Sequence, residues 1–216
     1  MMKTCYTVIL GNYDKLRNPT VITPGWKYVC FTDTPEICHG TVYSPRQVIE
    51  SARAVLDELN AKRWKWSINP HRAQKRVYHD GNFQIIGNLD EYIKPFEDAA
   101  FATRLHPSRK SLIQETQACL DQGKITPEDA LFVVDQLLDM DTDPQGLWEN
   151  GLLYFNTTNA DFAEWDGHFW HLTQMLQHIT RDQILLPMVL ENEVVPELID
   201  RDHAEKFFKY YQTHLR

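Results

Sequence analysis

The fold is decided where an apolar strand runs into a short polar turn and out into a second strand, in Arg76-Val77-Tyr78-His79-Asp80-Gly81-Asn82-Phe83-Gln84-Ile85-Ile86-Gly87-Asn88-Leu89. The turn at Asp80, Gly81 and Asn82 places two oxygen-bearing side chains at a strand end. In an α/β sheet, ligands collect at the carboxyl ends of the strands. A carboxylate with a neighbouring amide can hold a hard divalent cation through oxygen. Because Asp-Gly and Gly-Asn are also favoured in hairpin turns, a purely structural turn is the alternative.

Length and composition favour one globular domain covering residues 1–216, since 43% hydrophobic and 12% aromatic residues are ample for a packed core. The chain shows no Gly/Ser-rich linker and no repeat. A formal net charge of -8 argues against broad binding to a phosphate backbone. A nucleotide ligand remains compatible with this charge.

The cysteines and the N-terminus bear on the compartment. Cys5, Cys30, Cys38 and Cys119 form no Cys-x-x-Cys pair, which favours buried free thiols in a reducing environment. The N-terminus lacks the pattern of a secretory signal, and no apolar stretch approaches the roughly 18 residues of a membrane span. These observations predict a cytoplasmic protein without a membrane span.

The first third of the chain has the pattern of an α/β nucleotide-binding layer. Residues 4–10 and 26–32 read as buried parallel strands that end in polar loops, and a third strand is expected at residues 77–79. Helical spacing of apolar residues over 45–60 predicts a crossover helix between the second and third strands. Strand, loop, strand, helix, strand is how such a layer begins.

The remainder is expected to be rich in helices. The pattern predicts a helix over 89–93 capped by Asn88, a strand over 101–104, and a helix that starts at Ser108 or Ser111 and ends near Gly123. A strand is expected over 151–156, with helices over 161–178, 181–190 and 202–215. Thr126 and Pro127 should begin a further helix. The residues of this helix that we expect to pack in the core are Leu131, Val134, Leu137 and Leu138.

Several polar residues near the predicted strand ends are candidates for nucleotide binding. Gly11 allows close backbone approach and Tyr13 offers a flat face for stacking, while Asp33 can bond a base or ribose edge. Lys65 and His71 precede the third strand and can reach a diphosphate. Each of these also fits an ordinary polar turn or a solvated basic linker.

Two further groups are candidates for anion binding and catalysis. His106 and Arg109 stand at the entry to a helix, whose N-terminal dipole favours anions. Glu149, Asn150 and Gly151 precede an apolar strand next to Trp148, a platform for a sugar ring, and an acid there can act as a general base. The helix start at Arg181, Asp182 and Gln183 offers a cation, an acid and an amide, although capping explains the Asp equally well.

Other chemistries lack their signatures. The histidines and cysteines form no zinc-binding cluster, and no phosphate-binding glycine loop, dinucleotide fingerprint or nucleophile elbow is present.

An ordered series of short motifs resembles a known family, the glycosyltransferase-like domain shared by plant mucilage-related proteins and by bacterial and phage polysaccharide-locus proteins. The motifs are Tyr6 to Asp14, Trp26 to Asp33, Asn69-Pro70-His71, His79 to Asn82 with Gly87 to Asp90, His106 to Arg109, Leu147 to Gly151, and Arg181 to Gln183 with Pro187. The resemblance implies a GT-A-like, Rossmann-type α/β fold: a mostly parallel sheet flanked by helices, with a helix-rich C-terminal half.

The same resemblance implies what the residues bind. A nucleotide-sugar, most often a UDP-sugar, would lie at the carboxyl edge of the sheet, with Mn²⁺ or Mg²⁺ bridging its diphosphate to Asp80 and Asn82. Tyr13, Asp33 and Gly81 would lie on the nucleotide side. Glu149, Arg181 and Asp182 would be catalytic on the side of the sugar and the acceptor. The turn departs from the family's Asp-x-Asp pattern, because its second ligand would be a neutral amide.

The sequence therefore predicts a glycosyltransferase that moves a sugar to an acceptor hydroxyl on a polysaccharide or other glycan. A nucleic-acid acceptor fits less well with the acidic charge. Two alternatives stay open. One is a metal-dependent amide or ester hydrolase that uses Asp80, His79 and His106, and the other is a catalytically inactive module that binds nucleotide-sugars or glycans.

Overall fold

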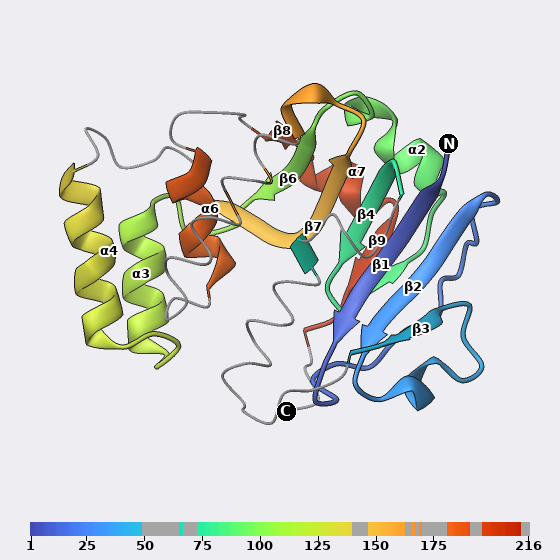
Figure 1. The fold of residues 1–216 in the computed structure, drawn as a ribbon, viewed down its shortest axis with the longest axis horizontal. Helices are drawn as coiled ribbons and strands as arrows, with labels where there is room; N and C mark the ends of the chain where they lie inside the picture. The colour runs from blue at the N-terminus through green and yellow to red at the C-terminus, as the bar shows by residue number, and fades with distance from the viewer. Residues whose placement is uncertain are drawn as a thin grey trace.

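The computed structural model describes residues 1–48, 65–66, 73–139, 147–162, 166, 169, 181–190 and 196–212. Within these residues, the main sheet has seven strands in the order β3-β2-β1-β4-β7-β6-β8 (Figure 1). A second sheet pairs two short strands, β5 and β9. The strands are β1 (Lys3–Ile9), β2 (Trp26–Thr32), β3 (Ser44–Gln47), β4 (Lys75–His79), β5 (Phe83–Ile85), β6 (Phe101–Leu105), β7 (Trp148–Asn156), β8 (Glu197–Leu198) and β9 (Phe208–Tyr210).

The main sheet is mixed and mostly parallel. Strands β3, β2, β1 and β4 run parallel to one another, and β6 runs parallel to β8. Strand β7 runs antiparallel to both of its neighbours, β4 and β6. The carboxyl ends of β1, β2 and β4 therefore meet at one edge, and the start of β7 lies beside the end of β4. The predicted α/β sheet with parallel strands at 4–10, 26–32 and 77–79 is confirmed.

The helices bear out most of the predicted boundaries. They are the 3-10 turns η1 (Pro35–Cys38) and η2 (Lys94–Phe96) and the α-helices α2 (Leu89–Ile93), α3 (Leu112–Asp121), α4 (Pro127–Asp139), α6 (Asp182–Leu190) and α7 (Arg201–Glu205). Asn88 caps α2 by accepting from two backbone amides, and Ser111 rather than Ser108 caps α3. Gly123 follows α3 with a φ of 64°, the left-handed conformation that glycine tolerates best.

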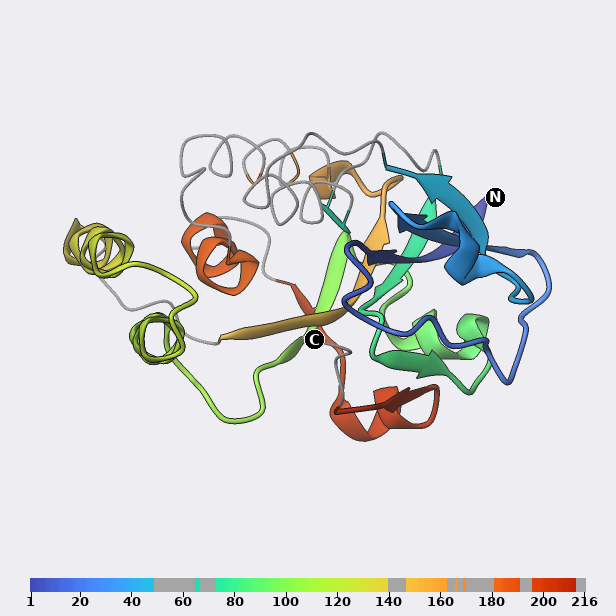
Figure 2. The ribbon, with the colours of Figure 1, turned by 90° about the horizontal axis from the view of Figure 1, so that it is seen from below.

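Two hydrophobic clusters cover the two faces of the sheet, because alternate side chains of a strand point to opposite sides. Tyr6 of β1 belongs to one cluster, together with buried residues of α3, α4 and α6. Cys5 and Ile9 of the same strand belong to the other, with buried residues of α2 and α7. Figure 2 shows α2 and α7 together on one side of the sheet. The helices thus flank the sheet, and the four cysteines are free and buried, as predicted.

The turn at Asp80 is not a hairpin. Strand β4 pairs with β1 and β7, whereas β5 pairs with β9 in the second sheet. Gly81 is not among the residues with positive φ. A Cβ atom on Gly81 would lie 2.6 Å from the Asp14 Cβ, so close packing requires the glycine. The alternative prediction, a hairpin turn between two paired strands, was therefore wrong.

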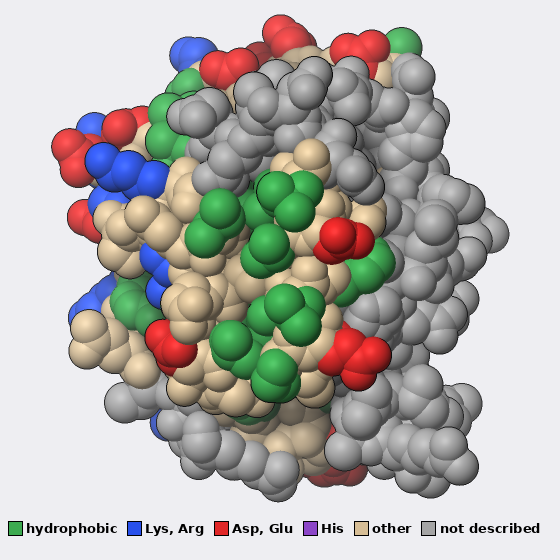
Figure 3. Space-filling model, turned by 90° about the vertical axis from the view of Figure 1, so that its left-hand side faces the viewer, with side chains coloured by type: hydrophobic (Ala, Val, Ile, Leu, Met, Phe, Trp, Pro, Cys, Tyr) green, Lys and Arg blue, Asp and Glu red, His purple; other side chains and the backbone are tan. Residues whose placement is uncertain are grey.

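Three expected helical features were wrong. Residues 44–47 form strand β3 beside β2, so no helix begins at residue 45, and residues 49–60 lie outside the described part. The region after residue 202 forms a short α7 and then strand β9, because Phe207 and Phe208 pack under the sheet. In α4, the core is contacted by Ala130 and Val133, while three of the residues expected there, Leu131, Val134 and Leu138, are exposed. Figure 3 faces that side of the molecule and shows hydrophobic side chains gathered on it.

Most of the predicted helix over 161–178 lies outside the described residues. Among those that are described, none of the helices has the length and apolar character needed to span a bilayer. The cytoplasmic location stays a prediction.

Candidate functional site

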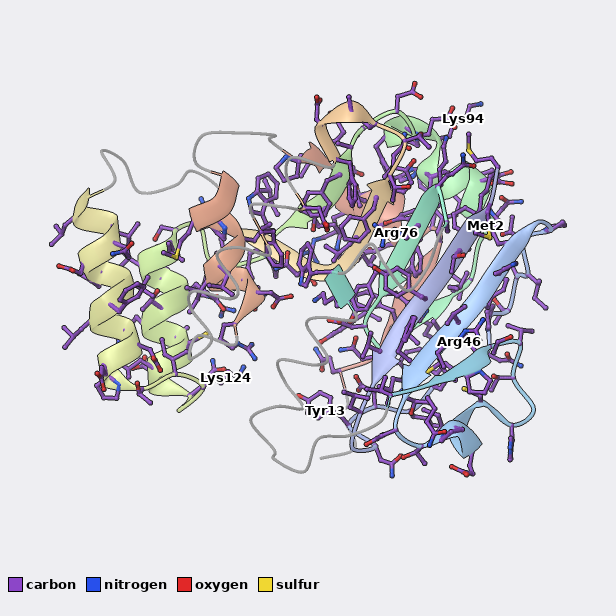
Figure 4. The ribbon with its side chains drawn as sticks, in the orientation of Figure 1. Met2, Tyr13, Arg46, Arg76, Lys94 and Lys124 are labelled. Atoms are coloured by element: carbon purple, nitrogen blue, oxygen red, sulfur yellow. The ribbon has the colours of Figure 1, made fainter. Side chains whose placement is uncertain are left out.

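A cleft of about 690 Å³ opens at the carboxyl edge of the parallel strands. Its walls come from the ends of β1 and β4, the start of β7, the start of α6 and the loop between α3 and α4. Figure 4 labels Tyr13, which follows β1, and Lys124, which approaches from the α3–α4 loop. Thirteen predicted site residues line the cleft, namely Gly11, Tyr13, Lys65, Asp80, Gly81, Asn82, His106, Glu149, Asn150, Gly151, Arg181, Asp182 and Gln183.

Three predicted residues are not placed there. Asp33 and Arg109 are absent from the lining, and His71 lies outside the described residues. Asp33 instead holds the β1 loop, because its Oδ2 accepts a hydrogen bond from the Gly11 amide at 2.8 Å. Gly11 and Asn12 have φ of 59° and 53°, so this loop takes the left-handed turn that glycine and asparagine favour. The bond from Asp33 fixes the loop that carries Tyr13, whose side chain is half exposed.

An ion-pair network forms the floor of the cleft. The Lys65 Nζ lies 2.8 Å from Asp182 Oδ2 and 3.8 Å from Asp80 Oδ1. Asp182 Oδ2 also accepts from the Trp66 indole at 3.2 Å, and Asp80 Oδ1 accepts from the Tyr78 hydroxyl at 2.5 Å. Burial, and then the charge of Asp80, raise the pKa of Tyr78 well above its usual value, so this hydroxyl stays a donor. Both predicted acids are thus tied to one buried ammonium.

Gly151 lets two walls of the cleft approach one another. The Asp80 amide donates to the Gly151 carbonyl at 2.9 Å, which fixes the turn against β7. A Cβ atom on Gly151 would lie 3.0 Å from the Phe83 ring and 3.2 Å from Asp80 Oδ2. A side chain at Gly151 would therefore push against the Asp80 carboxylate.

Glu149 is held by two arginines. Its Oε1 accepts from Arg104 Nη2 at 2.7 Å, and its Oε2 accepts from Arg201 Nη2 at 3.3 Å. Arg104 is buried on β6, and a register shift between Thr103 and Arg104 brings it opposite Glu149. Both carboxylate oxygens of Glu149 therefore carry an ion pair.

His106 is oriented by its own loop. Its Nδ1 accepts from the Arg109 amide at 3.0 Å, and its Nε2 lies 2.8 Å from Arg109 Nη2. Arg109 also pairs with the buried Glu115 of α3. Burial, and then the Arg109 charge, lower the pKa of His106, which favours the neutral ring. Arg109 therefore acts on His106 rather than on the cleft.

Among the described residues, two buried amides in the cleft wall have polar atoms without a hydrogen-bond partner. Asn82 Oδ1 and both polar atoms of Asn150 have none, although each residue is almost fully buried. An unmet buried polar group costs about 1–3 kcal/mol, and such groups in native proteins are commonly met by a ligand or by water. These amides are the part of the wall that is prepared for a polar ligand.

The residues that would hold the implied metal are Asp80 and Asn82. Asn82 Oδ1 suits a cation, being an oxygen without a partner. Asp80 fits less well, since its Oδ1 already receives the Tyr78 hydroxyl and faces the Lys65 ammonium, which leaves only Oδ2 for a cation. Within the described ranges, no group of three or more His, Cys, Asp or Glu side chains is arranged to hold a metal. Asp80 and Asn82 therefore fit a divalent cation poorly while Lys65 keeps its place, and the metal stays a prediction.

Some residues of the cleft were missed from the sequence. Asp14 and Tyr78 line it beside residues that were proposed, Lys124 comes from the α3–α4 loop, and Tyr210 comes from β9. The first two stood within quoted motifs. Nothing in the local sequence distinguishes Lys124 from other surface lysines, and Tyr210 was assigned to a helix.

The chain thus has an α/β fold, a mostly parallel mixed sheet flanked by helices with a polar cleft at its carboxyl edge. No protein-family model and no curated protein matches it. Among solved structures, it is similar to the bifunctional glycosyltransferase WbbM, with 12% identity, a TM-score of 0.47, and coverage of 89% of this chain and 38% of that one. It is also similar to the glycosyltransferase GlyE of Streptococcus pneumoniae, with 11% identity, a TM-score of 0.49, and coverage of 91% of this chain and 45% of that one. The chain spans less than half the length of either.

Proposed function

We propose that the protein is a glycosyltransferase that moves a sugar from a nucleotide-sugar, a UDP-sugar in the first instance, to the hydroxyl of a glycan acceptor. One observation carries the proposal. A single cleft at the carboxyl edge of the parallel strands gathers carboxylates, cations, unpartnered amides and an exposed aromatic ring from six separate parts of the chain. This is the mixture of groups that a charged, hydroxyl-rich ligand requires.

Each wall of the cleft supplies a different contact. The Tyr13 ring offers a stacking face for the base on the loop that Asp33 fixes. Lys65, Lys124 and Arg181 supply positive charge for a diphosphate. Asn82 and Asn150 have donors and acceptors suited to sugar hydroxyls. Asp182 and Glu149 are the acids on the acceptor side, and each is paired with a cation.

The hydrolase alternative loses one of its two proposed histidines, since His106 lines the cleft and His79 does not. His79 is buried, does not line the cleft, and uses both ring nitrogens, on Tyr43 and on the Asp80 carbonyl. The inactive binding module shares every contact above and differs only in turnover.

The test is a thermal-shift screen of UDP, GDP, CMP and their sugars, with Mn²⁺ and with EDTA, followed by an assay of donor hydrolysis. A transferase binds one nucleotide and consumes its sugar donor. Binding without turnover would indicate the inactive module. If no nucleotide shifts the melting temperature, the glycosyltransferase proposal fails.

Asp80→Ala tests the site itself. We expect nucleotide binding to change by about tenfold or more, because the variant removes one of the two carboxylates that share the Lys65 ammonium and so alters the charge that faces the diphosphate. Asp33→Asn is the matched comparison on the nucleotide side. It keeps an oxygen that can accept from the Gly11 amide, so binding should change less. Unchanged binding in Asp80→Ala would remove this residue from the site.

A further inference from the structure

The ammonium of Lys65 is a buried and tightly held charge in the cleft. Only 6% of its side chain is exposed, yet the residue lines the cleft. Its Nζ lies between two acids from distant parts of the chain, Asp80 after β4 and Asp182 at the start of α6. It also lies 4.9 Å from the centre of the Tyr78 ring.

The backbone of Lys65 is fixed as well. Its carbonyl accepts from the buried Tyr6 hydroxyl at 2.5 Å, which anchors the residue to β1. The next residue, Trp66, is fully buried and donates to the same Asp182 oxygen that Lys65 contacts. An ammonium held in this way cannot swing into solvent without breaking several contacts at once. It is a built-in charge rather than a flexible surface lysine.

We propose that the Lys65 ammonium is the resident cation of this site and stands where the resemblance implies a divalent metal. It lies between Asp80 and Asp182 and offsets part of their negative charge from a fixed position in the cleft. The proposal deepens the proposed function by assigning the charge compensation of a donor diphosphate to protein side chains, with Lys65 as a positioning residue for both acids.

Two physical arguments support the assignment. A divalent cation on Asp80 would meet the Lys65 charge at short range in a partly buried site, where like charges repel strongly. The available ligand set is also weak, because Asn82 is neutral and Asp80 Oδ1 is already engaged. An ammonium needs only the two acids that are present.

The test measures Mn²⁺ uptake by the full chain after EDTA treatment, from the loss of the free-Mn²⁺ electron paramagnetic resonance signal. It compares wild type, Lys65→Gln, Lys65→Arg, Asp80→Asn and the double variant Lys65→Gln/Asp80→Asn. Lys124→Gln is the matched control, because it removes another lysine of the same cleft that has no place between Asp80 and Asp182.

Lys65→Gln should bind Mn²⁺ about tenfold more tightly than wild type, since Asp80 and Asp182 lose the ammonium that lies between them. In titrations with Mn²⁺ alone, Lys65→Arg, Lys124→Gln and the double variant should behave like wild type. If circular dichroism shows that Lys65→Gln does not fold, the Mn²⁺ uptake of wild type is compared with that of Asp80→Asn instead. Mn²⁺ uptake by wild type that is unchanged in Asp80→Asn supports the proposal.

The proposal is overturned if wild type binds Mn²⁺ and Asp80→Asn abolishes that binding, with or without added UDP. It is also overturned if Lys65→Gln folds and gains no affinity. Mn²⁺ is titrated both alone and with UDP, so the two proposals can fail separately. If the protein binds no nucleotide, the transferase proposal fails, and the titration with Mn²⁺ alone still tests the role of Lys65.

Discussion

At the scale of single residues, His79 links the candidate site to the acid stability of the fold. The Asp80 carbonyl can only accept, so Nδ1 of His79 donates to it, and Nε2 accepts from the Tyr43 hydroxyl. This requires the neutral ring, and burial lowers the pKa of His79 from 6.5 to about 4. The unfolded chain therefore binds a proton before the folded chain does. The resulting stability is complete above pH 6.5 and is lost as the pH falls towards 4.

We expect this histidine to account for a loss of about 3 kcal/mol in the free energy of unfolding across that interval. Urea unfolding at a series of pH values measures the loss. In His79→Gln, which has no charge to gain, the pH dependence should be shallower by a similar amount. An equally steep profile in the variant would mean that other groups carry the acid sensitivity.

Gly81 is required by close packing rather than by its backbone angle. The nearest atoms to an added Cβ are the Cβ and Oδ2 of Asp14, at 2.6 and 3.0 Å, and Ile9 Cδ1 at 3.0 Å. Gly81→Ala should therefore lower the free energy of unfolding by about 1–3 kcal/mol and displace Asp80. Gly40→Ala is a useful contrast, since nothing lies near its Cβ and only its φ of 73° opposes the change. If Gly81→Ala costs less than Gly40→Ala, the close approach is not the reason for the glycine.

At the scale of elements, the sequence predicted those whose signals are local. Strands β1, β2 and β4 are apolar runs ending in polar residues, and α2 and α3 start at capping side chains. Strands β8 and β9 have only 2 and 3 residues, and their pairing partners lie far away in the chain, so no local pattern marks them. The turn at Asp80 was found because it is local. The ion pair between Asp80 and Lys65 was not predicted, because it depends on how the distant segment that carries Lys65 packs.

Helix α4 shows why periodicity alone misplaces a face. Ala130 and Val133 are buried, while Leu131, Val134 and Leu138 are also helically spaced but point outwards. Leu131→Gln should change the free energy of unfolding by no more than about 0.5 kcal/mol. Val133→Ala should cost about 1–3 kcal/mol, since it removes core contacts. Equal losses in these two variants, measured by urea unfolding, would mean that the outward face is covered in solution.

At the scale of the whole molecule, strand β7 joins the two parts of the sheet. It pairs with β4 on one side and with β6 on the other, and its residues lie in both hydrophobic clusters. The C-terminal segment contacts both sheets, because β8 pairs with β6 in the main sheet and β9 pairs with β5 in the second sheet. A fold joined in this way should unfold as one unit, which is how the predicted single domain can be tested.

Phe208→Ala makes that test quantitative. Phe208 is 3% exposed, and its ring centre lies 4.9 Å from that of Tyr92 in α2. Its removal should lower the free energy of unfolding by about 3–5 kcal/mol, whereas Ala at the exposed neighbour Lys209 should cost less than about 0.5 kcal/mol. Tryptophan fluorescence and far-ultraviolet circular dichroism should give the same urea midpoint in both variants, because a contact near the C-terminus then stabilises strands formed near the N-terminus. Two separate midpoints would show that the chain folds in two independent units.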